Sequence, residues 1–194
     1  MKNGQNNEMK LVLAILKSPE SEYNSRNLAK LIGLSPMGAL KIARRLENEN
    51  ILKSKKIGKS NIYSINFDNE YSFHYILFLL KKEAEQAKPY VRRWIRELNK
   101  VKHANAMVLF GSLLRKEKEA RDIDVLVIVN KNNFDTAKKE IDGINILNEK
   151  KVHPIYQTKE DLEKHIKEED KIILNAIKGI VVSGGETMIP IMKK

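Results

Sequence analysis

Two short apolar segments, joined by a polar stretch, constrain the fold of this chain more than any other feature. Ala106–Phe110 is an apolar run that ends at Gly111-Ser112, and Val125–Val129 is a second apolar run that follows Asp122-Ile123-Asp124. Apolar runs of this length, bounded by turn or polar residues, are typical of buried strands. The chain is therefore predicted to contain a sheet whose strand ends carry a Gly-Ser turn and an Asp-x-Asp pair.

The Asp-x-Asp pair indicates a site for a divalent cation and a phosphate. Residues two apart in a strand point to the same face, so the carboxylates of Asp122 and Asp124 are expected to lie side by side. Such a pair repels unless a cation such as Mg²⁺ or Mn²⁺ neutralises it. Gly111 lets a backbone N–H approach a phosphate closely, and Ser112 offers a hydroxyl and is predicted to begin a helix. Each motif alone is also common as a plain turn feature, so the prediction depends on their order.

These residues resemble the signature of the minimal nucleotidyltransferases of the DNA polymerase beta superfamily, a Gly-Ser turn followed at a short distance by Asp-x-Asp. Nine residues separate Ser112 from Asp122, one fewer than is usual, and the resemblance covers approximately residues 105–185. It implies that Gly111 and Ser112 hold a nucleoside triphosphate, with Arg115 near its phosphates. It also implies that Asp122 and Asp124 are catalytic and bind Mg²⁺.

The resemblance further implies a third carboxylate on the next strand, which is predicted at 151–156. His153, followed by Pro154, stands in that place. A neutral histidine can bind a metal, but it is a poor substitute among the oxygen ligands that Mg²⁺ prefers. Glu149 or Glu160 are alternative carboxylates, and His153 could equally be a strand-end residue with a hydrogen-bonding role.

Charge places a nucleic-acid partner at the N-terminal part of the chain. Residues 1–67 carry twelve basic and five acidic side chains, whereas residues 105–194 carry sixteen and fifteen. A polyanion such as double-stranded DNA is therefore expected to bind in the first third. The absence of cysteine excludes disulfides and thiolate zinc sites. With no signal peptide and no membrane-spanning segment in the sequence, the protein is expected to be cytoplasmic.

Residues 8–67 have the periodicities of three helices followed by a hairpin. The predicted helices cover 9–16, 26–32 and 36–48, and the predicted strands cover 51–57 and 61–67. This order resembles the winged helix-turn-helix domains of bacterial and archaeal transcription regulators. The end signals are N-caps at Ser25 and Ser35 and a stop at Gly33.

The resemblance implies that the third helix enters the major groove of DNA and that the hairpin touches phosphates or the minor groove. The alternative is a winged helix that binds protein, with its lysines merely solvated. The side chains expected to contact DNA are Lys41, Arg44, Arg45, Lys55, Lys56, Lys59 and Ser60.

Two helices, predicted at 70–87 and 90–101, form a connector that could either pair two copies of the chain or pack on its own chain. Beyond the Asp-x-Asp strand, a strand–helix alternation fits a small α/β sheet domain, with one long helix predicted at 159–178. The predicted fold class is α+β, with an N-terminal winged helix at 1–67, a helical connector at 68–104 and a mixed α/β nucleotidyltransferase domain at 105–194.

Three functions fit this organisation. The first is a DNA-binding protein that transfers a nucleotide from a nucleoside triphosphate, with ATP as first candidate, to an unknown acceptor. The second is a transcription regulator, pairing as a homodimer, whose C-terminal domain has lost catalysis and senses a nucleotide or mediates contacts. The third is an antitoxin-like nucleotidyltransferase that pairs with a helical toxin. The Gly-Ser turn and both aspartates favour the first function, and the missing third carboxylate favours the second.

Overall fold

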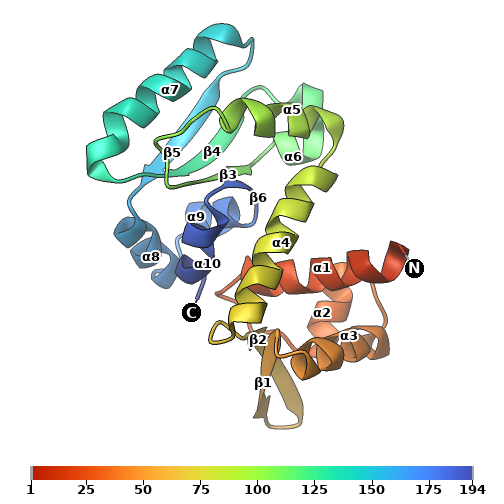
Figure 1. The fold of residues 1–194 in the computed structure, drawn as a ribbon. Coiled ribbons are helices and arrows are strands. Elements are labelled where there is room, and N and C mark those ends of the chain that lie inside the picture. The colour runs from red at the N-terminus through yellow and green to blue at the C-terminus, as the bar shows by residue number, and fades with distance from the viewer. Residues whose placement is uncertain (1, 194) are drawn as a thin grey trace. The chain divides into compact units, whose positions relative to one another are not determined.

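The structure, a computed structural model, describes residues 2–193 and divides the chain into two compact units (Figure 1). One unit comprises Met1–Leu79 with Met192–Lys194, and the other comprises Leu80–Ile191. The boundary falls within helix α4 (Glu70–Gln86). Among the described residues, no helix combines the length and the apolar character needed to cross a membrane.

The first unit contains three helices followed by a two-stranded antiparallel hairpin, in the predicted order. The helices are α1 (Lys2–Leu16), α2 (Ser25–Ile32) and α3 (Pro36–Asn48), and the strands are β1 (Leu52–Ile57) and β2 (Ser60–Ile65).

Capping residues explain where α2 and α3 begin and end. Ser35 caps α3 and accepts a hydrogen bond from the backbone N–H of Gly38, as predicted. Gly33 closes α2 in the left-handed conformation, with φ 73°. The prediction of Ser25 as the cap of α2 was wrong by one residue. The side chain of Asn24 accepts from the N–H groups of Arg26 and Asn27 at 2.9 and 3.0 Å, so it caps the helix instead.

Small and branched apolar side chains fill the core of the first unit. On α3, Ala39, Ala43 and Leu46 form the inward stripe and are fully buried. Two alanines on this face allow α3 to pack closely against its neighbours. Other fully buried side chains of this core include Leu11, Val12, Leu28, Ile51 and Ile76.

The second unit is built on a four-stranded mixed sheet of order β5-β4-β3-β6. The strands are β3 (Ala106–Phe110), β4 (Ile123–Ile128), β5 (Val152–Gln157) and β6 (Ile180–Ser183). β4 pairs in parallel with β5, whereas β3 pairs antiparallel with both β4 and β6. β3 and β4 are almost completely buried, which confirms the two apolar runs as core strands.

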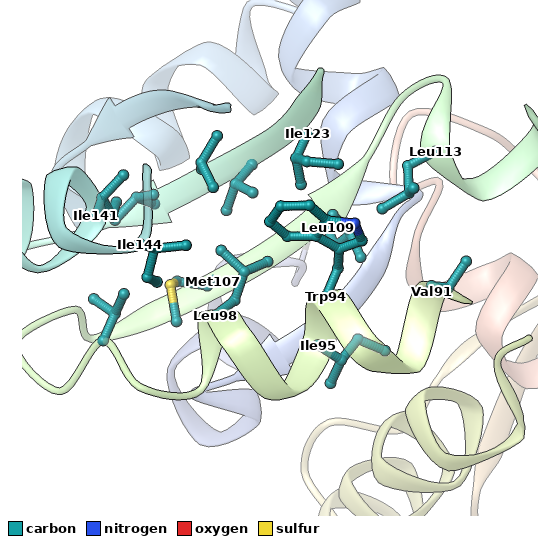
Figure 2. Close-up of a cluster of buried hydrophobic side chains, with 14 of the residues drawn as sticks. Val91, Trp94, Ile95, Leu98, Met107, Leu109, Leu113, Ile123, Ile141 and Ile144 are labelled. Carbon is teal, nitrogen blue, oxygen red and sulfur yellow. The ribbon is translucent and has the colours of Figure 1, made fainter. Parts of the chain in front are cut away.

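Helices cover both faces of this sheet. On one face, Met107, Leu109 and Val125 join a core with α5 (Pro89–Leu98) and α7 (Phe134–Leu147) (Figure 2). Side chains alternate along a strand, so their neighbours point to the other face. There β3 contacts α9 (Lys171–Ile177) and α10 (Gly185–Ile191), and α8 (Lys159–Lys167) contacts β5. α5, predicted as part of the connector, thus packs on its own chain.

The single long helix predicted at 159–178 is wrong, because α8 and α9 are separate. Glu169 adopts a left-handed conformation, with φ 57°, that interrupts the helix. Asp170 then caps α9, and its carboxylate accepts from the N–H groups of Ile172 and Ile173 at 2.8 and 3.0 Å. A side chain that can cap a helix competes with helix continuation, and periodicity alone does not reveal which of the two prevails.

Candidate functional site

The Gly-Ser turn and the aspartates meet at one end of the β3–β4 pair. Antiparallel register sets Phe110 opposite Asp124, so the chain passes the Asp124 side chain as it leaves β3. Gly111 lies at that point with φ 78°, and a Cβ atom there would be 2.0 Å from Oδ2 of Asp124. Both the backbone conformation and the space therefore require glycine.

His153 completes a group of three potential ligands. Parallel register sets His153 opposite Asp124, in the place where the sequence predicted a missing carboxylate. Nδ1 of His153 is 3.3 Å from Oδ2 of Asp122. One donor atom from each of Asp122, Asp124 and His153 lies within 4.8 Å of the other two. Glu149 and Glu160 are not in this group, which is the one three-residue cluster of its kind among the described residues.

The surroundings of Asp124 disfavour its ionisation beside the carboxylate of Asp122. Burial raises the pKa of Asp124, and the neighbouring Asp122 carboxylate raises it further. A hydrogen bond from the backbone of Ser112 and the nearby His153 lower this pKa, but they do not reverse the shift. Carboxylates held close together against their own repulsion are typical of functional sites that bind a cation.

The helix predicted at Ser112 is very short. α6 (Leu113–Lys116) ends because Glu117 leaves the helical conformation, with φ 50° and ψ −114°. The Ser112 side chain makes no capping hydrogen bond, and a helix of this length offers little dipole to an anion. Arg115 lies on α6 with an exposed side chain, and no described contact joins it to the aspartates. Its predicted position near the phosphates stays a prediction.

The donor set and its surroundings fit a divalent cation. Carboxylates and imidazoles are common metal ligands. Asp122 directly precedes β4, and Asp124 and His153 are the second residues of β4 and β5. Gly111, lacking a Cβ, leaves space for the Asp124 carboxylate. A cation at this group would neutralise the phosphate charge of a bound nucleotide.

Residues 93–178 match the family model described as Polymerase beta, Nucleotidyltransferase. The matched segment begins within α5 and includes β3, β4 and β5, so it contains the Asp122–Asp124–His153 group. It supports a nucleotidyltransferase domain in the second unit and, at this level, confirms the resemblance derived from the Gly-Ser and Asp-x-Asp motifs. No curated protein and no solved structure matches the chain.

The first unit, which lies outside the matched segment, has a basic hollow of about 430 Å³. Arg26 at the start of α2, Arg44 on α3 and Lys59 at the hairpin turn line it together with Ser60. None of its described lining residues is acidic. Tyr63 also lines the hollow, and its buried hydroxyl has no hydrogen-bond partner among residues 2–193.

The remaining predicted DNA contacts lie outside this basic hollow. Lys41, Lys55 and Lys56 are exposed. Arg45 is exposed too, but its guanidinium pairs with Glu8 and, at 3.8 Å, with Glu49. These ion pairs offset the positive charge of Arg45, so it is a weaker candidate for anion binding than Arg44.

Sequence reasoning missed Arg26. It lies in the first turn of α2, where a positive charge opposes the helix dipole. An unfavourable charge next to an N-cap is a signal that could have identified it as a candidate binding residue.

Gly111→Ala is expected to disturb the Asp122–Asp124–His153 group and to lower stability by about 1–2 kcal/mol, since alanine is strained at positive φ. The new methyl group would displace the Asp124 carboxylate, so nucleotide transfer should fall at least about tenfold. Chemical denaturation and a transfer assay measure the two effects. Gly143→Ala is the control: Gly143 lies in α7 with free space around it, so this change should stabilise by about 0.5–1 kcal/mol.

Proposed function

We propose that this protein is a DNA-binding nucleotidyltransferase that transfers a nucleotide from a nucleoside triphosphate to an acceptor hydroxyl. The observation that carries the proposal is the Asp122–Asp124–His153 group beside Gly111, within the segment matched by the nucleotidyltransferase model. ATP is the first nucleotide to test. Asp122, Asp124 and His153 would hold a divalent cation, Mg²⁺ or Mn²⁺, which when bound neutralises phosphate charge.

The reaction would be a displacement at the α-phosphorus of the triphosphate. The acceptor oxygen forms a bond to phosphorus, the bond between the α-phosphorus and the bridging oxygen breaks, and pyrophosphate leaves. The hydroxyl proton passes to solvent, which reaches the site because Asp122 and His153 are partly exposed. Gly111, which has no side chain, would let the backbone approach the reacting phosphates. The carboxylate of Asp124 is oriented by its hydrogen bond from the Ser112 backbone.

Incubation with α-labelled nucleoside triphosphates tests the enzymatic proposal. The full chain is mixed with each nucleotide, a divalent cation and candidate acceptors, including DNA, RNA and the protein itself. Transfer of label with release of pyrophosphate is expected. Absence of transfer with every nucleotide and both Mg²⁺ and Mn²⁺ would refute the enzymatic part.

The first unit is proposed to be a winged helix domain that binds double-stranded DNA. Support comes from the helix and hairpin order and from the basic hollow between α2, α3 and the hairpin turn. Arg26, Arg44 and Lys59 bring three positive charges together there, and no described residue forms an ion pair with any of them. Such a concentration of unpaired cations fits a phosphate of the DNA backbone.

Arg44→Gln and Lys59→Gln are each expected to weaken binding of a short DNA duplex by about three- to tenfold. Each should also lower the slope of log Kd against log salt by about 1, because one phosphate contact is lost. Fluorescence anisotropy across a salt series measures both quantities. Lys138→Gln, an exposed lysine on α7 of the nucleotidyltransferase domain, removes the same charge and should leave the slope unchanged. Equal effects of all three variants would contradict a DNA site in the hollow.

His153 favours a second candidate function, a regulator with a degenerate nucleotidyltransferase domain. In this function the site binds a nucleotide without turning it over, because the third carboxylate is replaced. Tight, salt-dependent DNA binding by a homodimer, together with nucleotide binding and no transfer, would favour the regulator. Co-purification with a helical toxin that becomes labelled would favour the antitoxin-like role.

A further inference from the structure

The third position of the metal-binding group holds a nitrogen donor rather than a carboxylate. Parallel pairing of β4 and β5 sets His153 opposite Asp124, on the same face of the sheet. The donor atoms of these residues and Asp122 lie within 4.8 Å of one another. Ligands bound to one ion by bonds of about 2.1 Å lie roughly 3–4.2 Å apart, so side-chain movements of about 1 Å or less would let the three residues share an ion.

His153 is held in place and accessible. Its side chain is 61% exposed, and Nδ1 lies 3.3 Å from Oδ2 of Asp122, a contact that a shared cation would replace. Pro154 follows it and keeps the preceding residue extended. β5 is an edge strand, where a proline without an N–H is tolerated. The imidazole is therefore directed to the aspartates by the backbone and needs no rearrangement of the sheet.

Metal ions differ in their affinity for this donor set. Mg²⁺ prefers oxygen ligands in a near-ideal octahedron. First-row transition ions accept an imidazole nitrogen together with carboxylates, and their affinities rise from Mn²⁺ to Co²⁺. Mn²⁺ also shares the preference of Mg²⁺ for phosphate oxygens, so it suits both the protein ligands and a nucleotide.

We propose that His153 makes this site selective for a divalent first-row transition ion, Mn²⁺ in the first place, over Mg²⁺. The inference rests on the proposed function, because it concerns the metal of the same site. The resemblance implies three carboxylate ligands, whereas this site has two carboxylates and the imidazole of His153.

Direct metal binding tests the inference without an enzymatic readout. Isothermal titration calorimetry of the full chain compares Mn²⁺ and Mg²⁺ in the wild type, His153→Asp and His153→Ala. The wild type should bind Mn²⁺ at least about tenfold more tightly than Mg²⁺, because the nitrogen ligand favours the transition ion. His153→Asp should bind Mg²⁺ more tightly than the wild type does and reduce this ratio. His153→Ala should weaken Mn²⁺ binding by about tenfold.

A spectroscopic measurement and a matched variant identify the ligand. The visible absorption of the Co²⁺ complex should change in His153→Asp, because an oxygen replaces a nitrogen in the coordination shell. His74→Ala is the control, since His74 is 65% exposed and belongs to the other unit. It should bind Mn²⁺ as the wild type does. Circular dichroism verifies that each variant is folded.

The failure of this inference and the failure of the proposed function are distinguishable. Equal affinities of the wild type for Mn²⁺ and Mg²⁺, unchanged Mn²⁺ binding in His153→Ala, or no binding of either ion overturns the inference. Binding of Mn²⁺ that depends on His153, without nucleotide transfer, supports the inference and removes the enzymatic proposal. If Mg²⁺ supports transfer as well as Mn²⁺ does, and His153→Ala leaves transfer unchanged, the enzymatic proposal is supported and the inference is overturned.

Discussion

Asp124→Asn is expected to abolish nucleotide transfer while the nucleotidyltransferase domain remains folded. Asp124 is the carboxylate at the centre of the site, opposite both Phe110 and His153 in the sheet and in contact with the Gly111 turn. Without the negative charge of Asp124, a bound cation would lose a ligand that nucleotide transfer requires. A loss of about 4 kcal/mol of transition-state stabilisation corresponds to a rate reduction of roughly 10³-fold.

The same substitution should leave the free energy of unfolding unchanged or slightly higher. Burial and the Asp122 carboxylate raise the pKa of Asp124, which means that the fold disfavours its ionised form. A neutral asparagine of similar shape removes this repulsion, and such a trade between stability and activity is typical of functional sites. A transfer assay and chemical denaturation measure the two effects. Asp135→Asn, an exposed aspartate in the first turn of α7, is the matched control and should retain transfer.

A variant of Asp124 that transfers nucleotide at the wild-type rate would exclude this group as the catalytic site. A variant that unfolds would assign a structural role to the carboxylate instead. Metal titrations of the same variant separate these outcomes, because loss of Mn²⁺ binding in a folded protein is expected only if Asp124 is a ligand.

Trp94→Ala is expected to lower the stability of the second unit by about 3–5 kcal/mol. Trp94 is 1% exposed, and its side chain points from α5 into the core around Leu109 (Figure 2). Its removal would leave a large cavity between α5 and the sheet. The experiment also tests whether α5 is an integral part of the nucleotidyltransferase domain, because a connector helix that only paired two chains would not destabilise the sheet.

Trp94→Phe provides the conservative comparison. The indole N–H of Trp94 is buried without a hydrogen-bond partner among the described residues, so phenylalanine removes an unsatisfied donor together with part of the volume. Its destabilisation should therefore be smaller, about 1–2 kcal/mol. Circular dichroism during urea unfolding measures both variants, since the chain has one tryptophan and its fluorescence is lost. A loss below about 1 kcal/mol for Trp94→Ala would contradict the assigned role of α5.

Local signals in the sequence were sufficient for most elements of the fold. Apolar runs predicted the buried strands β3 and β4, and turn residues predicted the hairpin after α3. Capping residues predicted the start of α3 at Ser35 and the end of α2 at Gly33. All of these signals come from residues that are close together in the chain. Errors arose where two local preferences compete. Asp170 could continue a helix or cap one, and Glu117 could extend α6 or end it.

The sequence by itself identified the members of the candidate site, because their residue types and order already indicate its chemistry. They are the two aspartates, the glycine beside them and the histidine in place of a third carboxylate. Only the tertiary structure decided that His153 contacts Asp122, and that Arg26, Arg44 and Lys59 share one hollow whereas Arg45 is paired with Glu8. These contacts join residues far apart in the chain. Strand register and helix packing set such distances, and neither can be calculated from local periodicity.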